Sequence, residues 1–290
     1  MHGLLVSARL TYLPGGLLLY ILGVFVGAGP ICWWLVGIGL AIVTLVHVLT
    51  HYINDAEDVA TDDVTEEPTV FTGGSRAIQR GLVTPARLRR ASAILALVTV
   101  GLIVVLAAVG NGPVAAGLFA ATLFFAYSYS GPPLRLGRVG LGEVTAAGVM
   151  AVLVPVAGAA TAGGFTRALW PLVALLFAQT FFARLCTAYP DIAADRATKK
   201  WTLTALVGER GSAIVFGVAA VANFLVGDAI ATQQASANAR FASGCVVALA
   251  SMIIAILIAT KRVQRKPVWV PVIGLGATGA ALVIITLAYV

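Results

Sequence analysis

Long apolar runs separated by short polar segments dominate the hydrophobic pattern of this chain. Nine of these runs have about the length, ~20 residues, that an α-helix needs to cross a bilayer. They cover residues 13–29, 31–52, 91–110, 113–131, 141–162, 168–188, 212–230, 241–260 and 268–289. Only three charged residues lie within them, Glu143, Arg184 and Asp228. The pattern therefore predicts an all-α polytopic membrane protein, a bundle of nine transmembrane helices.

The composition agrees with this class. Of 290 residues, 60% are hydrophobic and 11% charged, whereas soluble domains carry about 25% charged residues. Cys32, Cys186 and Cys245 lack the spacing of metal ligands, so we interpret them as small packing residues. No small-residue cleavage site followed by a soluble domain marks the first run as a signal peptide, so we expect a retained helix. We expect residues 1–290 to form a single integral-membrane domain.

The basic residues predict the orientation. If the N-terminus is cytoplasmic, 16 of the 19 Lys and Arg residues lie on inner connections, and only Arg167 and Arg240 lie outside. This bias follows the positive-inside rule and explains the net charge of +7 without a nucleic-acid partner. All acids except Asp228 also lie on or beside the inner side. We therefore expect a multi-pass protein of the cell membrane, with a central cavity and active site facing the cytoplasm.

Two acidic segments lie at predicted inner helix ends. In NDAEDVATDD (54–63), a continuous helix would place Asn54, Asp58 and Asp62 on one face, with Asp55 adjacent and Glu57 directed away. PDIAAD (190–195) repeats the four-residue spacing. Like charges at this spacing repel by ~0.2–0.5 kcal/mol per pair, which favours a compensating cation. A site with oxygen ligands and no His or Cys favours Mg²⁺, bound together with substrate phosphates. Taken alone, either acidic segment is equally compatible with a solvated helix end.

These segments resemble the motifs of the UbiA superfamily of intramembrane prenyltransferases, NDxxDxxxD after the second of nine helices and DxxxD after the sixth. FTGGSRAIQRGLVTP (71–85), YSYSGPPLRLGRVGLGEV (127–144) and PDIAADRATKKWTLTALVG (190–208) are similar to further segments of that family. The resemblance covers about residues 13–210 by motif and the whole chain by helix count. It implies Mg²⁺-dependent transfer of a prenyl group from an isoprenyl diphosphate to a hydrophobic or aromatic acceptor.

The resemblance also implies site residues. The expected metal ligands are Asn54, Asp55, Asp58, Asp62, Asp191 and Asp195. Of these, Asp55, Asp58, Asp191 and Asp195 are expected to be catalytic. The expected substrate contacts are Asn54, Arg76, Tyr127, Arg135, Arg138, Arg184, Arg196, Lys199 and Lys200. Among the basic residues, Arg76, Arg138 and Lys199 rank first because they lie within family-like motifs.

Helical spacing adds two histidines to this set. His47 and His51 share the face of Asn54 and Asp58, deeper toward the bilayer. Ionisable groups inside a membrane are functional candidates, so we expect His51 to orient or deprotonate an acceptor hydroxyl. The alternative is that each histidine bonds a neighbouring group of the bundle.

The sixth run carries Arg184 on the face of residues 188, 191 and 195. A buried arginine needs a partner, either an acid of the first segment or the diphosphate. Aromatic rings can stabilise a carbocation, and Tyr127 and Tyr129 are the best candidates for this role. The alternative is that these aromatic side chains only pack in the bundle. The other aromatic residues considered for the cavity wall are Phe124, Phe125, Phe177, Phe181 and Phe182.

Three functions remain open on the sequence. The GGSR segment favours an aromatic (quinone-precursor) or ether-lipid acceptor over hydroxybenzoate, because an Arg/Lys-rich first loop is absent. A UbiA-related membrane terpene cyclase would use the same metal–diphosphate site without an acceptor. A transporter would place its acids at the midplane, whereas here they lie at the inner rim.

Overall fold

The structure is a computed structural model that describes residues 2–66, 68–69, 72–109, 112–231, 237–263 and 267–287. Throughout these residues the regular elements are helices, apart from isolated bridges between residues 27 and 165 and between 139 and 201. The elements are α1 (His2–Ser7), η1 (Leu10–Tyr12), α2 (Leu13–Phe25), α3 (Trp33–Glu57), α4 (Val59–Asp63), α5 (Pro85–Val109), α6 (Pro113–Ser130), η2 (Leu136–Arg138), α7 (Gly142–Gly148), η3 (Val149–Leu153), α8 (Val154–Thr161), α9 (Leu169–Ala188), η4 (Tyr189–Asp191), α10 (Ile192–Ala197), α11 (Leu203–Ala231), α12 (Ala237–Ala259) and α13 (Trp269–Leu287).

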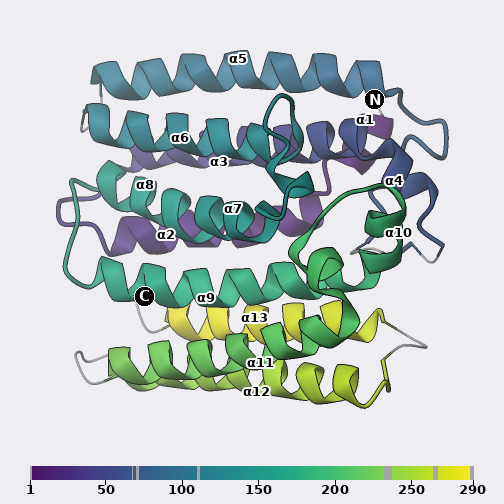
Figure 1. Cartoon of the computed structure of the whole chain (residues 1–290). Coiled ribbons are helices and arrows are strands. Elements are labelled where there is room, and N and C mark those ends of the chain that lie inside the picture. Colours follow the sequence, from purple (N-terminus) through teal and green to yellow (C-terminus); the bar gives the residue numbers. More distant parts are fainter. Residues whose placement is uncertain are drawn as a thin grey trace.

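The nine predicted spans are confirmed. Within the described ranges, nine helical segments are long and apolar enough to cross a membrane. The long helices lie side by side, and the short helices α4 and α10 lie together at one end of the bundle (Figure 1). This end carries both acidic segments, so the fold brings together two parts of the sequence that are far apart.

Several helices extend beyond the apolar runs from which they were predicted. Helix α3 continues to Glu57 rather than ending at residue 52, and α5 begins at Pro85 rather than at residue 91. The hydroxyl of Thr84 accepts the N–H of Arg87, and proline is well suited to a first helical position. Helix propensity and capping set these ends, whereas apolarity sets only the part of the helix inside the bilayer.

The fifth span is not a regular α-helix. It consists of α7, the π-helical segment η3 and α8, with Pro155 in the first turn of α8. Proline lacks an N–H and cannot donate to the preceding turn, which accounts for the local change in winding.

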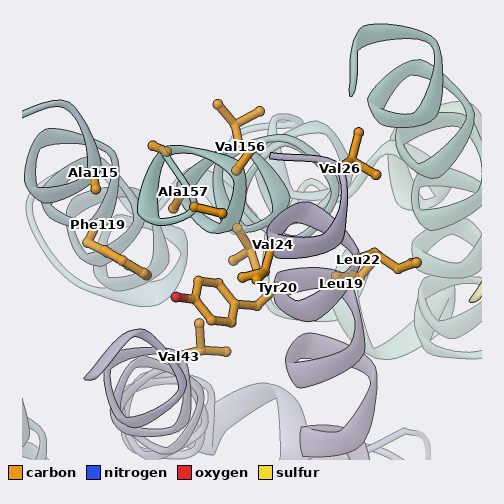
Figure 2. Close-up of a cluster of buried hydrophobic side chains, with 14 of the residues drawn as sticks. Leu19, Tyr20, Leu22, Val24, Val26, Val43, Ala115, Phe119, Val156 and Ala157 are labelled. Carbon is orange, nitrogen blue, oxygen red and sulfur yellow. The ribbon is translucent and has the colours of Figure 1, made fainter. Parts of the chain in front are cut away.

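The core next to the cavity is built on close helix packing. A Cβ at Gly23 would lie 1.9 Å from the carbonyl oxygen of Pro155, and one at Gly158 would lie 2.3 Å from that of Tyr20. Only glycine therefore lets α2 and α8 approach this closely. Figure 2 shows the ring of Tyr20 pointing toward Phe119 of α6, with a centroid distance of 5.9 Å. This packing fixes α2, which forms one wall of the cavity.

Candidate active site

A cavity of about 390 Å³ opens between the helices and carries both acidic segments in its wall. Asp58, Asp62, Asp191 and Asp195 all line it, together with apolar residues such as Val43. Val43 precedes Asp58 on α3 by fifteen residues, which corresponds to about 22 Å of helix. The cavity therefore has a polar end near α4 and α10 and an apolar wall deeper in the bundle.

The first acidic segment is not one continuous helix. Helix α3 ends at Glu57, Asp58 adopts φ −100° and ψ 13°, and α4 begins at Val59. The predicted stripe is thus interrupted at Asp58, whose carbonyl accepts the N–H groups of both Thr61 and Asp62. Asn54, Asp58 and Asp62 nevertheless line the same cavity. Asn54 Nδ2 donates to Asp58 Oδ2 at 2.8 Å and to Ser130 Oγ at 3.0 Å, which fixes its orientation.

Asp55, predicted as a metal ligand and catalytic residue, is not among the residues that line the cavity, and these roles stay a prediction. Its carboxylate is 3% exposed and forms an ion pair with Arg9 at 3.2 Å. The backbone N–H and the hydroxyl of Ser75 also donate to it. These bonds tie the end of α3 to the N-terminal segment and to the loop after α4, so Asp55 has a structural set of partners.

The second acidic segment continues α9 through the short helices η4 and α10. As predicted from their spacing, Arg184, Ala188, Asp191 and Asp195 line one cavity. Among the described residues, the Oδ1 atoms of both aspartates are buried and accept no hydrogen bond. Asp195 Oδ2 accepts a hydrogen bond from Thr202 Oγ1 at 2.9 Å.

Lys200 joins the two acidic segments. Its Nζ lies 2.8 Å from Asp58 Oδ2 and 3.7 Å from Asp195 Oδ1. Burial favours the neutral amine, but the carboxylates of Asp58 and Asp195 outweigh it and raise the pKa of Lys200. Burial likewise disfavours ionised Asp58, but Lys200 and Arg138 outweigh it and hold the pKa of Asp58 below its usual range. Burial first, and then the carboxylates of Asp58 and Asp55, raise the pKa of Asp62 to about 7.

Most of the predicted basic contacts lie outside the cavity wall. Arg138 bonds Asp58 Oδ1 at 3.1 Å, and Arg135 pairs with Glu57 Oε2 at 2.9 Å. Arg76 donates to the carbonyl of Asp62, and Arg196 donates to that of Ala205. Six of the predicted substrate contacts do not line the cavity: Arg76, Tyr127, Arg135, Arg138, Arg196 and Lys199. Of the six basic residues considered as phosphate donors, Lys200 lines the cavity, whereas Arg76, Arg138 and Lys199, which ranked first, do not.

The two predicted histidines both line the cavity. His47 Nε2 lies 3.3 Å from the carbonyl of Arg9, which holds one ring nitrogen. The ring of His51 packs edge-on against His47 at 4.5 Å and stacks on Tyr12 at 6.0 Å. His51 is therefore held by ring contacts on two sides.

Arg184 also lines the cavity, beside Tyr129. Its Nη2 donates to the Tyr129 hydroxyl at 2.9 Å, and its guanidinium carbon lies 5.8 Å from the centre of the ring. Of the two partners considered for Arg184, an acid of the first segment and the diphosphate, the first is not found, since Arg184 forms no ion pair among the described residues.

Some of the predicted aromatic residues line the cavity and others do not. Phe125 and Tyr129 line the cavity, whereas Phe124 is 54% exposed. Phe182 packs against Phe216 in the core, and Phe177 and Phe181 stack on each other away from the cavity wall. The side chain of Asp228, which we singled out as an intramembrane acid, lies outside the described residues.

A comparison with family profiles decides the relationship that the motifs indicated. The profile described as the UbiA prenyltransferase family matches residues 16–272, most of the chain. The chain belongs to this family. No curated protein compared with the chain matches its sequence.

Solved UbiA structures share the fold. A UbiA homologue from Archaeoglobus fulgidus bound to DMAPP and Mg²⁺ is 12% identical, with a TM-score of 0.70 over 97% of this chain and 98% of its own. An apo UbiA homologue from Aeropyrum pernix K1 is 16% identical, with a TM-score of 0.68 over 95% and 98%. A structure of digeranylgeranylglyceryl phosphate synthase is 15% identical, with a TM-score of 0.59 over 100% and 98%.

Three residues at or beside the polar end of the cavity were not predicted as site residues. Arg9 was counted only as a topology signal, although it lines the cavity and binds Asp55. Thr202 lines the cavity beside Asp195 and is 4% exposed, and Glu143, which accepts the N–H of Leu203, is 3% exposed. Glu143 could have been found, because it is an isolated acid at the start of an apolar run. Arg9 and Asp55 are 46 residues apart, and no local spacing predicts their contact.

Proposed function

We propose that this UbiA protein transfers a prenyl group from an isoprenyl diphosphate to an aromatic quinone precursor or lipid acceptor, with Mg²⁺ as cofactor. One observation carries the proposal. Asp58 and Asp195 come from distant segments, share Lys200, and line the polar end of a cavity with a deeper apolar wall. An isoprenyl diphosphate matches these two parts of the cavity, because it has an anionic head and a hydrocarbon tail.

The donor atoms at this end fit Mg²⁺. They are carboxylate and amide oxygens, which this hard cation prefers, and two of the carboxylate oxygens have no hydrogen-bond partner among the described residues. No three His, Cys, Asp or Glu side chains of the described residues gather closely enough to hold an ion alone. This favours ions held by one or two carboxylates and completed by phosphate oxygens. The residues that would hold them are Asn54, Asp58, Asp62, Asp191 and Asp195.

The chain's own residues suit the remaining chemistry. Lys200 and Arg184 line the cavity and would donate hydrogen bonds to the diphosphate. Bound Mg²⁺ would stabilise the charge on the leaving diphosphate. As the allylic C–O bond breaks, the positive charge on the prenyl carbon would meet the rings of Phe125 and Tyr129. The apolar wall excludes water, so the prenyl carbon bonds to the acceptor, which loses a proton.

His51 is the proposed acceptor-side residue. Replacing His51 with Phe should lower turnover about 100-fold, because a positioned base contributes about that much or more, while the affinity for diphosphate stays unchanged. His51→Asn keeps a hydrogen-bonding group without a base, so it should lower kcat and leave the acceptor KM nearly intact. The measurement is steady-state kinetics at varied acceptor concentration. Unchanged kcat and KM in His51→Phe would remove His51 from the mechanism.

The orientation is likewise a proposal, supported by the positive-inside bias. Lys199 is exposed and is next in sequence to Lys200, which lines the cavity. In a variant with Cys32, Cys186 and Cys245 replaced by Ala, a single Lys199→Cys substitution should react with a membrane-impermeant maleimide in inverted vesicles and not in intact cells. Labelling of intact cells would place the site on the outer side.

The reaction itself is tested with the purified protein, Mg²⁺ and a panel of isoprenyl diphosphates, with and without dihydroxynaphthoate-type aromatic and glycerol-lipid acceptors. The proposal predicts acceptor-dependent diphosphate release and a prenylated product. Release with a cyclic hydrocarbon or alcohol instead would identify a terpene cyclase. No release with any diphosphate would contradict both functions.

A further inference from the structure

The orientation of Asp195 depends on Thr202. The Thr202 hydroxyl donates to Asp195 Oδ2 at 2.9 Å and accepts the N–H of Ala205 at 3.3 Å. Thr202 directly precedes α11, so the second bond is that of a helix N-cap. Because the hydroxyl has one proton and that proton is directed to Asp195, the cap also fixes the direction of the donated hydrogen bond. Lys200 then contacts the other oxygen of Asp195, Oδ1, at 3.7 Å.

Glu143 also bonds the first residue of α11. Its Oε1 accepts the N–H of Leu203 at 3.0 Å. The carboxylate is 3% exposed, and a buried acid that lies at the start of an apolar span requires such a partner. Glu143 does not line the cavity, so its effect on the site passes through Leu203 and Thr202.

The segment before α7 also reaches the first acidic segment. The backbone N–H of Trp201 donates to the carbonyl of Arg138 at 3.2 Å, while the Arg138 side chain bonds Asp58 Oδ1 at 3.1 Å. Residues 138–143 therefore contact both acidic segments, Asp58 directly and Asp195 through Thr202. Two carboxylates that share a metal–diphosphate group need a fixed separation, and these bonds supply one.

We propose that Glu143 and Thr202 are positioning residues that hold Asp195 at the correct distance from Asp58 for Mg²⁺ and diphosphate. The proposal rests on the proposed function, since it assigns Asp195 to the metal–diphosphate site. Residues behind metal ligands commonly change metal affinity about 10- to 100-fold when they are replaced. Glu143 does not line the cavity, whereas Thr202 lines it and acts through Asp195, to which its hydroxyl donates.

The test measures binding of Mg²⁺ with inorganic diphosphate by calorimetry, alongside turnover. Thr202→Val, which removes the hydroxyl, should raise the Mg²⁺ concentration for half-maximal binding about 10- to 100-fold, and Thr202→Ser should restore it. Glu143→Leu should also raise the Mg²⁺ concentration for half-maximal binding. Glu143→Gln, which keeps an acceptor oxygen, should raise it less. Thr99→Val is the matched control, because Thr99 is a fully buried threonine of α5 whose hydroxyl donates to the carbonyl of Leu95, and it does not line the cavity.

Two outcomes separate the inference from the proposed function. If the wild-type protein binds Mg²⁺–diphosphate and Thr202→Val binds it equally well, the positioning role is wrong. If Thr202→Val lowers only thermal stability, and Thr202→Ser restores that stability without any change in Mg²⁺ dependence, the hydroxyl is only a helix cap and the inference is also wrong. If the wild-type protein itself binds no Mg²⁺–diphosphate, the proposed function has failed.

Discussion

Replacing Asp191 with Asn should abolish most turnover and leave the fold intact. Asp191 lines the cavity, and its buried Oδ1 has no hydrogen-bond partner in the described part of the chain. The isosteric amide therefore breaks no bond to that oxygen, but it removes the charge that would hold a cation. A loss of about 3 kcal/mol of metal-based stabilisation corresponds to a fall of about 100-fold in kcat/KM. Steady-state kinetics and the thermal unfolding midpoint in detergent measure the two effects separately.

Asp63→Asn is the matched control. Asp63 belongs to the same acidic segment but lies outside the cavity wall, where its Oδ1 accepts a hydrogen bond from Gln79. Asparagine keeps that acceptor, so kcat/KM should stay close to the wild-type value. Equal losses in Asp191→Asn and Asp63→Asn would indicate a general charge effect rather than a metal ligand.

Replacing Lys200 with Met should strongly destabilise the metal-free protein. Lys200 is the shared cation of Asp58 and Asp195, and both carboxylates are nearly fully buried. Removing one partner of a buried ion pair leaves uncompensated charge and costs about 3–5 kcal/mol. Added Mg²⁺ with inorganic diphosphate should recover part of the loss, because the cations then compensate the same carboxylates. Thermal unfolding with and without these additions measures both effects.

Lys199→Met controls for the loss of a lysine. Its side chain is exposed and lies outside the cavity wall, so the free energy of unfolding should change by less than about 0.5 kcal/mol. A metal-free Lys200→Met protein as stable as the wild type would show that Lys200 does not join the two segments.

The helices were predictable because the bilayer sets their length and apolarity. Their ends were less predictable, since Pro85 and Leu203 start helices in polar sequence where capping decides. Helix α11 is kinked at Gly208, whose φ of 70° is not helical, so the residues before and after it form two helical segments. The spacing of Arg184, Asp191 and Asp195 predicted one helix face, and all three residues line the cavity, because helical periodicity fixes which residues share a face.

The partners of the charged residues were not predictable in the same way. Arg135 binds Glu57 across 78 residues, and Arg9 binds Asp55 across 46. Many arginines and acids crowd this end of the bundle, and local spacing does not select among them. Glu57, which we expected to face away from the site, draws both Arg89 and Arg135 to itself. Arg76 and Arg138, the arginines ranked first by motif, bond the carbonyl of Asp62 and the carboxylate of Asp58 instead of lining the cavity.

The central claim is that the two acidic segments form one site for Mg²⁺ and an isoprenyl diphosphate. A double-mutant cycle with Asp58→Asn and Asp191→Asn tests it most directly, measured as kcat/KM for the isoprenyl diphosphate. Residues that act as a unit are strongly non-additive, so the double variant should lie within about tenfold of the worse single variant. If the two losses multiply instead, the segments act independently, and the account of a shared site is contradicted.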